Sequence, residues 1–207
     1  MATRYPTGTS SRTVGAQTAP NEFSALAAYL AEFAKSPLAV GSPIPTFRHT
    51  VNRLLAPVDW QRVKLLLEYG PGTGRFTADA LARMRPDATL IAIDSSEGFT
   101  GHLRTAIPDR RLRAVTGSAQ DVETLVAAQG FTRADCILSG LPFSTLPDGD
   151  GEAILAASRR LLRPGGQFLA YQVRGGIRRL LDRHFRTVEH TREWLNLPPY
   201  HLYWCRT

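Results

Sequence analysis

Cysteine, lysine and long apolar runs are all scarce in this sequence. Only two of the 207 residues are cysteines, Cys136 and Cys205, which is too few for a disulfide framework or a cysteine-rich metal site. No apolar run approaches the roughly 20 residues that a membrane-spanning helix needs. The N-terminus has no apolar signal core either, so we expect a cytosolic protein rather than a secreted or membrane-integral one.

The histidines do not indicate a metal site. They lie far apart in the sequence, without the spacing of metal ligands, at His49, His102, His184, His190 and His201. We expect them to be structural or surface residues, and we expect no bound metal. The two cysteines fall in strands that are not predicted to be neighbours, so they are expected to be thiols in the core.

The shortage of lysine makes arginine the main carrier of positive charge. Lys35 and Lys64 are the only lysines, and the other 23 basic residues are arginines. Residues 1–154 are neutral overall, whereas residues 155–207 carry ten arginines against three acids and hold the whole net charge of +7. This asymmetry favours an anionic partner, either nucleic acid or an anionic membrane surface. The alternative is a solvated helix face.

The length and the apolar content predict one α/β domain with an N-terminal extension. Hydrophobic residues make up 43% of the chain, enough for a sizeable core. Residues 1–20 lack periodicity and are expected to form a flexible tail. Residues 21–56 are expected to be helical and to cover a membrane or substrate site. They comprise a helix over 22–35 with Phe23, Leu26, Leu30 and Phe33 on one face, and a second helix capped by Thr46 with Phe47, Val51, Leu54 and Leu55 inward.

From residue 57 to residue 207, strand and helix patterns alternate. Strands are predicted at 65–69, 89–94, 111–116, 135–139, 167–173, 185–194 and 200–206. Helices are predicted between them at 74–84, 96–106, 119–128, 150–162 and 176–184. Such alternation is typical of βαβ units and predicts a doubly wound, mostly parallel sheet. The two closing strands have no helix between them and are expected to be antiparallel.

A glycine-rich loop follows the first predicted strand. It reads Glu68-Tyr69-Gly70-Pro71-Gly72-Thr73-Gly74, with an acid two residues before the first glycine. Glycines at this point let the backbone turn tightly and approach a ligand at a helix N-terminus. The loop lacks the Gly-Lys-Ser/Thr of a P-loop. Asp94 ends the next strand, where its carboxylate can accept both ribose hydroxyls, so the pair suits a nucleoside that carries an amino acid.

The loop and Asp94 resemble the class I S-adenosylmethionine-dependent methyltransferases. The resemblance implies a seven-stranded sheet with an antiparallel last strand. It also implies that Glu68, Gly70, Gly72 and Gly74 surround the methionine part of S-adenosylmethionine, that Asp94, with Ser95 beside it, holds the ribose, and that Ser118 and Ala119 border the adenine. The product would be S-adenosylhomocysteine. Many relatives have aspartate where Ser118 stands.

The fourth strand ends in Ser139-Gly140-Leu141-Pro142-Phe143, which lies beside the transferred methyl group in this family. It resembles the Ser-Gly-Leu-Pro of bacterial phospholipid N-methyltransferases. The rRNA adenine dimethyltransferases have asparagine where Ser139 stands. On residues alone, the segment is also compatible with a simple strand-ending turn.

Three further segments resemble the phospholipid enzymes. They are residues 33–46, Pro164-Gly165-Gly166 before the fifth strand, and the terminal Trp194-Leu195-Asn196-Leu197-Pro198-Pro199. Two departures are Tyr171-Gln172-Val173, where the family tends to have a Phe-Thr-Tyr run, and Tyr200 in place of a small residue.

The resemblance implies N-methylation of a phospholipid head-group amine, with phosphatidylethanolamine as the expected acceptor and phosphatidylcholine as the end product. The residues expected at the site of transfer are Ser139, Gly140, Leu141, Pro142 and Tyr171. Three alternatives stay open: an rRNA adenine N6-dimethyltransferase, a methyltransferase of another aminolipid such as an ornithine lipid, and a cofactor-binding protein without catalysis.

We expect a monomer attached peripherally to the inner face of the cytoplasmic membrane, without a nucleic-acid partner. Two elements are expected to meet the anionic surface. One is the apolar stripe of residues 22–35, and the other is the helix at 176–184 with Arg178, Arg179, Arg183 and Arg186 free to face lipid phosphates.

Overall fold

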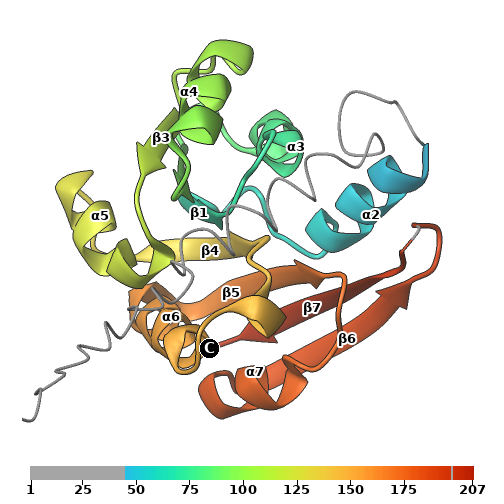
Figure 1. The fold of residues 1–207 in the computed structure, drawn as a ribbon. Coiled ribbons are helices and arrows are strands. Elements are labelled where there is room, and N and C mark those ends of the chain that lie inside the picture. The colour runs from blue at the N-terminus through green and yellow to red at the C-terminus, as the bar shows by residue number, and fades with distance from the viewer. Residues whose placement is uncertain (1–44, 197) are drawn as a thin grey trace, which may run out of the picture.

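The computed structural model describes residues 45–196 and 198–207 (Figure 1). The expected tail at 1–20 and the expected helix at 22–35 lie outside the described residues. So does Leu197 in the terminal loop.

A single seven-stranded sheet forms the centre of the described chain, in the order β3-β2-β1-β4-β5-β7-β6. Its strands are β1 (Leu65–Tyr69), β2 (Thr89–Asp94), β3 (Leu112–Thr116), β4 (Ala134–Ser139), β5 (Leu162–Gln172), β6 (Thr187–Glu193) and β7 (Tyr200–Arg206). The first five are parallel, and β7 inserts antiparallel between β5 and β6. The doubly wound sheet with an antiparallel last strand is therefore confirmed.

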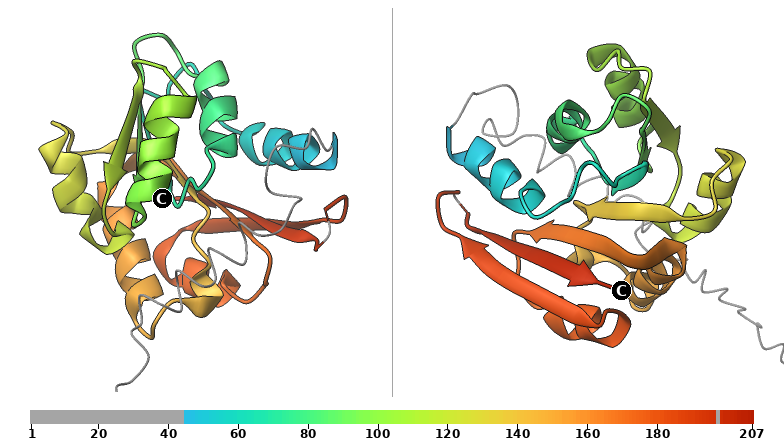
Figure 2. Two further views of the ribbon diagram at one scale, coloured as in Figure 1. Left: turned by 45° about the horizontal axis from the view of Figure 1, so that its top comes forward. Right: turned by 180° about the vertical axis from the view of Figure 1, so that it is seen from behind.

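Helices cover both faces of the sheet (Figure 2). They are α2 (Pro45–Leu55), α3 (Arg75–Arg83), α4 (Glu97–Ala106), α5 (Val122–Ala128), α6 (Asp150–Leu161) and α7 (Arg178–His184), with short 3-10 turns η1 (Ala119–Asp121) and η2 (Phe143–Thr145). Apolar residues of α2, α3 and α4 pack on one face, and those of α5, α6 and α7 pack on the other. β1 is buried along its whole length because it lies between these two layers.

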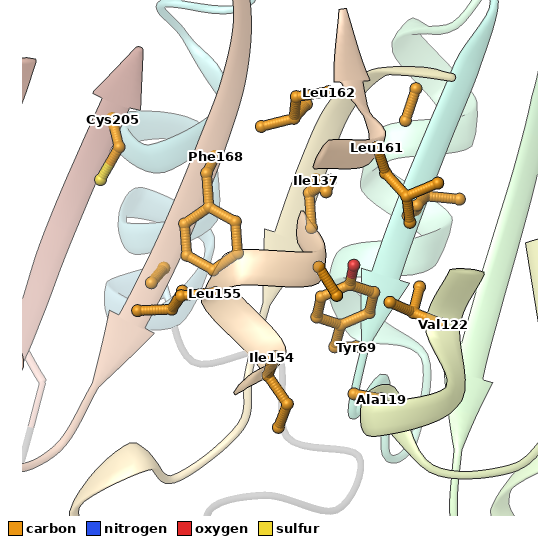
Figure 3. Close-up of a cluster of buried hydrophobic side chains, with 14 of the residues drawn as sticks. Tyr69, Ala119, Val122, Ile137, Ile154, Leu155, Leu161, Leu162, Phe168 and Cys205 are labelled. Carbon is orange, nitrogen blue, oxygen red and sulfur yellow. The ribbon is translucent and has the colours of Figure 1, made fainter. Parts of the chain in front are cut away.

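Figure 3 shows the second of these layers, where Tyr69 of β1 and Phe168 of β5 lie beside Ile154 and Leu155 of α6. The Tyr69 hydroxyl is paired with the Ser158 hydroxyl at 3.2 Å, so the polar end of this buried ring is satisfied. Cys205 belongs to the same cluster. Cys136 and Cys205 are free, buried and separated by β5, as expected, and burial raises the pKa of each thiol to about 12.

The structure corrects several predicted boundaries, among them that of β6, which begins at Thr187 instead of residue 185. α2 begins at Pro45, so Thr46 lies inside the first turn instead of capping it. Pro suits that first position because its missing N–H would have no helical partner. β5 begins at Leu162 instead of residue 167, because Arg163 to Gly166 form an irregularity between the pairs Ala134–Leu162 and Cys136–Gln167. α7 begins two residues later than predicted.

Backbone hydrogen bonds align the loops that leave the carboxyl ends of the central strands. The amide of Gly70 donates to the carbonyl of Ile93, and the amide of Gly140 donates to that of Tyr69, both at 2.9 Å. The amide of Gly117 donates to the carbonyl of Asp94, also at 2.9 Å. The loops after β1, β2, β3 and β4 therefore lie side by side at one edge of the sheet, which is where ligands bind in doubly wound folds.

Candidate active site

The glycine loop turns directly from β1 into α3. Gly70, Gly72 and Gly74 all have positive φ angles, of 63°, 55° and 81°, a backbone region that other residues adopt at a cost. At Gly74 space is also limiting, because a Cβ would lie 2.8 Å from Cδ1 of Ile107 and closer still to Leu103. The third glycine thus lets the loop pack against Leu103 and Ile107 at the end of α4 as it enters α3.

Glu68 lies beneath this loop and is 1% exposed. Its Oε2 accepts a hydrogen bond from the Thr77 hydroxyl of α3 at 2.7 Å. Its Oε1 is buried and has no hydrogen-bond partner among the described residues. Burial raises the pKa of Glu68 to about 7, opposed by the Thr77 hydrogen bond and increased by the nearby charge of Asp94. An unpaired buried carboxylate oxygen is costly and calls for a cationic donor.

Asp94 joins the end of β2 to the glycine loop. It is 5% exposed, its Oδ1 accepts from the Ser96 amide at 2.9 Å, and its Oδ2 accepts from the Gly72 amide at 3.4 Å. Burial raises its pKa, and these two amide hydrogen bonds oppose part of the rise. The structure therefore brings together the loop and the acid that the sequence pairs, and fixes the orientation of the carboxylate.

The residues predicted to border the adenine lie on the neighbouring loops. Ser118 caps η1 by accepting from the Gln120 amide at 3.2 Å, and Ala119 is 7% exposed. Ser95 is exposed directly after Asp94. All three stand at the same sheet edge as the glycine loop. The Ser118 hydroxyl already accepts a hydrogen bond from a backbone amide of its own turn.

The segment after β4 stands against the same loop. Ser139 is fully buried, and its hydroxyl accepts from the Leu141 amide at 3.3 Å, so it shapes the turn. Gly140 leaves room for a close approach: a Cβ there would lie 2.9 Å from the Gly70 carbonyl oxygen and would collide with the Tyr171 hydroxyl. Pro142 then leads into η2. The end of β4 and the first glycine are therefore in near contact.

Aromatic rings lie next to the contact between Gly140 and Gly70. The ring of Tyr171 stacks on Phe76 of α3 with centroids 4.2 Å apart and meets the edge of Tyr200 at 6.0 Å. Burial raises the pKa of Tyr171 well above its ordinary value, and the Glu68 carboxylate raises it further. The hydroxyl therefore keeps its proton at neutral pH and cannot act as a base. Ring faces beside a carboxylate suit a cationic ligand.

Gln172 is a residue that the sequence reasoning did not select. It is 3% exposed, and its Nε2 donates to the carbonyls of Leu141 at 2.6 Å and of Tyr171 at 2.8 Å. Its Oε1 accepts from the Phe143 amide at 3.2 Å. Gln172 thus holds the loop after β4 from both sides. The sequence signal for this role was a polar residue directly after the apolar stretch Phe168–Tyr171 of β5.

Gln172→Ala is expected to loosen the loop after β4 without disturbing the glycine loop. The Leu141 carbonyl and the Phe143 amide would each lose their bond to Gln172 and keep only the bond to each other, which costs about 0.5–1.5 kcal/mol of stability per lost bond. We expect turnover to fall at least tenfold and the KM for the acceptor to rise, with S-adenosylmethionine affinity within about threefold of the natural protein. Gln167→Ala, in the middle of β5, is the control. An equal loss of cofactor affinity and turnover would mean that Gln172 only supports the fold.

The residues present fit S-adenosylmethionine. The unpaired Glu68 oxygen would suit the ammonium group of its methionine part, and the Asp94 carboxylate would suit the ribose hydroxyls. The glycine loop lets the backbone approach the ligand between them. No group of three or more His, Cys, Asp or Glu within residues 45–196 and 198–207 could hold a metal ion.

Comparisons with known proteins agree with this fit. A model of a methyltransferase domain matches residues 66–166, from β1 into β5. An ornithine lipid N-methyltransferase from Singulisphaera acidiphila is 27% identical over 180 residues, which cover 86% of this chain and 94% of that protein.

Two solved structures share the fold. One is the 1,6-didemethyltoxoflavin-N1-methyltransferase of Burkholderia thailandensis with its substrate and S-adenosylhomocysteine, with a TM-score of 0.66 and 22% identity over 95% of this chain and 98% of that one. The other is the N-methyltransferase NodS of Bradyrhizobium japonicum with S-adenosylhomocysteine, with a TM-score of 0.67 and 18% identity over 91% and 99% of the two chains. With the domain match and the site geometry, this chain belongs to the class I S-adenosylmethionine-dependent methyltransferases.

Proposed function

We propose that this protein transfers a methyl group from S-adenosylmethionine to the primary amine of a membrane lipid. The observation that carries the proposal is the similarity to the ornithine lipid N-methyltransferase, which extends over nearly the full length of both chains. The Ser139–Phe143 segment supports it from a second direction, because it has the form found in phospholipid N-methyltransferases.

The site residues account for the transfer through binding and dehydration. When bound, S-adenosylmethionine supplies an electrophilic methyl group. Glu68 would hold its ammonium group and Asp94 its ribose. Gly140 lets the loop after β4 pack closely against Gly70 and the Tyr171 hydroxyl. The acceptor amine would approach along this loop, past Leu141, Pro142 and Tyr171. A free primary amine has a pKa near ~10.4, and removal from water beside a cation lowers that value, which exposes the nitrogen lone pair. Correct placement supplies most of the rate.

Two different acceptors are favoured by two different observations. The curated relative favours an ornithine lipid, and the Ser-Gly-Leu-Pro segment favours phosphatidylethanolamine. The test is a labelled-methyl assay with three substrates side by side: phosphatidylglycerol vesicles that contain an ornithine lipid, the same vesicles with phosphatidylethanolamine, and rRNA. We expect label in the lipid extract and none in RNA. Label in RNA alone would replace this proposal with the adenine methyltransferase alternative.

We propose that the protein acts at the surface of an anionic membrane. Within the part of the chain that the structure describes, no helix has both the length and the apolar character to cross a bilayer. The predicted arginine patch on α7 needs correction, because two of its members are not free. Arg178 pairs with Asp182 at 2.9 Å and Arg183 pairs with Glu152 at 2.7 Å. Arg179 and Arg186 are exposed, so α7 offers less positive charge than the sequence suggests.

A further inference from the structure

Two large apolar side chains stand out on the described surface. Trp194 is 66% exposed and Leu195 is 53% exposed, and they are the large hydrophobic residues that residues 45–196 and 198–207 expose. They are adjacent, in the loop between β6 and β7. A paired tryptophan and leucine facing water is an unfavourable arrangement that marks an interaction site when the loop holds it in place.

The loop is held in place from within. Glu193 is 2% exposed, and its Oε1 accepts from the Leu195 amide at 3.1 Å. Its Oε2 accepts from Arg53 of α2 at 3.1 Å and is paired with His49 Nδ1 at 3.0 Å. Asn196 is buried and donates to the Thr50 hydroxyl. The polar residues on each side of the apolar pair are therefore anchored to α2, which leaves Trp194 and Leu195 pointing outward.

The loop stands at the same edge of the sheet as the candidate active site. β6 is parallel to β5 and ends at Glu193, and β7 starts opposite at Tyr200. His201 of β7 pairs with Gln172 at the end of β5, and the Tyr200 ring meets Tyr171. Figure 1 shows this end of the hairpin beside α2. Tyr200 thus connects this hairpin to Tyr171, which lies against Gly140 in the loop after β4, here called the acceptor loop.

The charge around the pair is positive. The guanidinium of Arg192 lies 4.3 Å from the centre of the Trp194 ring. Arg53, at the α2 side of the loop, is paired with the buried Glu193 carboxylate, so the exposed charge beside the pair is that of Arg192. The acid of this group, Glu193, is buried, and hydrogen bonds from Leu195 and Arg53 hold its pKa below the usual value despite its burial. Tryptophan with arginine and an aliphatic neighbour suits the interface of an anionic bilayer.

We propose that Trp194 and Leu195 insert into the interface of an anionic lipid bilayer and place the acceptor loop at the membrane surface. The inference rests on the proposed function, because a lipid amine must reach this edge from the bilayer. Arg192 would stay at the level of the lipid phosphates while the two apolar side chains enter. Docking through this loop would bring the head group to Tyr171 without withdrawing the whole lipid from the membrane.

Trp194 can report on its own insertion. The other two tryptophans bond internally: the Trp60 Nε1 donates to the Leu55 carbonyl at 3.2 Å and the Trp204 Nε1 to the Leu54 carbonyl at 2.8 Å. In a Trp60→Phe/Trp204→Phe protein, we expect a blue shift of Trp194 emission on addition of phosphatidylglycerol vesicles. We also expect quenching by brominated acyl chains. An unshifted, unquenched signal would overturn the proposal, and a shift that follows protein concentration without vesicles would assign the pair to self-association.

A second variant tests the proposal without the substitutions at Trp60 and Trp204. Trp194→Ala/Leu195→Ala in the otherwise natural chain is expected to sediment with phosphatidylglycerol vesicles at least tenfold more weakly. Its affinity for S-adenosylmethionine should be unchanged, which shows that the fold is intact. Vesicle binding equal to that of the natural protein would contradict the proposal. Because these vesicles contain no aminolipid, the result does not depend on the identity of the methyl acceptor.

Discussion

Glu68→Gln is expected to weaken S-adenosylmethionine binding by about ten- to a hundredfold and, at pH 8, to make the ligand-free protein more stable. The binding loss follows because a neutral amide replaces a carboxylate whose Oε1 has no partner within the described chain and which we propose as the partner of the ligand ammonium. Hydrogen bonds to charged groups contribute roughly 1.5–3 kcal/mol. Isothermal titration calorimetry measures the first effect. Glu97→Gln, an exposed acid in the first turn of α4, is the control.

The stability gain follows from the raised pKa of about 7. Below the unfolded value of 4.5 the carboxyl group is protonated in both states. Between 4.5 and 7 the folded protein holds the proton more tightly, so the free energy of unfolding falls as the pH rises through this window. Above pH 7 the penalty reaches on the order of 3 kcal/mol, and glutamine avoids it. Chemical denaturation at pH 5 and pH 8 should therefore separate the two proteins mainly at pH 8.

The same carboxyl group makes cofactor binding pH-dependent. The ligand ammonium pairs with the ionised form, so binding below pH 7 must release the proton from Glu68. The affinity of the natural protein is expected to rise between about pH 6 and pH 7.5 and then to level off, while Glu68→Gln stays flat. Calorimetry in buffers of different ionisation enthalpy counts the released protons. No proton release at pH 6 would contradict this role.

Asp94→Ala is expected to weaken S-adenosylmethionine binding by about ten- to a hundredfold through a different part of the ligand. The Asp94 carboxylate is held by the Ser96 and Gly72 amides and can accept from ribose hydroxyls, with roughly 1.5–3 kcal/mol for such charged hydrogen bonds. A 2′,3′-dideoxy analogue should bind the natural protein weakly and should bind Asp94→Ala as well as the full ligand does.

Glu97→Ala is the control, because Glu97 is an exposed acid three residues further along the chain. It should retain both the affinity and the preference for the hydroxylated ribose. If Asp94→Ala still preferred the full ligand over the dideoxy analogue by the natural margin, another residue would be the ribose acceptor.

Local patterns in the sequence predicted most of the fold. Buried parallel strands such as Leu65–Tyr69 are continuous apolar runs, and glycine marks the turn that follows, so their positions are readable from residues alone. The joining of Glu68, Gly72 and Asp94 could be predicted because parallel strands end at one edge. The start of β5 could not, since Pro164 and two glycines usually end an element, yet here an irregularity continues the strand beyond them.

Contacts between distant segments were beyond reach of the sequence. His190 and His201 look scattered, but they face each other across β6 and β7, with their ring nitrogens 2.9 Å apart, and burial lowers the pKa of both. Glu193 bonds to His49, which lies 144 positions earlier in the sequence, and no local pattern predicts that pair. The importance of Gln172 depends in the same way on a loop that starts over thirty positions earlier.

The attachment of α2 to the β6–β7 hairpin has a consequence for how the chain is made. Arg53 and His49 bond to Glu193, and the Trp204 indole donates to the carbonyl of Leu54, so this helix depends on strands that are synthesised 140 or more positions later. During translation, the apolar face of α2 must wait until nearly the whole domain has left the ribosome. A chain that stops before β7 would leave Val51, Leu54 and Leu55 without part of their cover, a form that proteases would recognise.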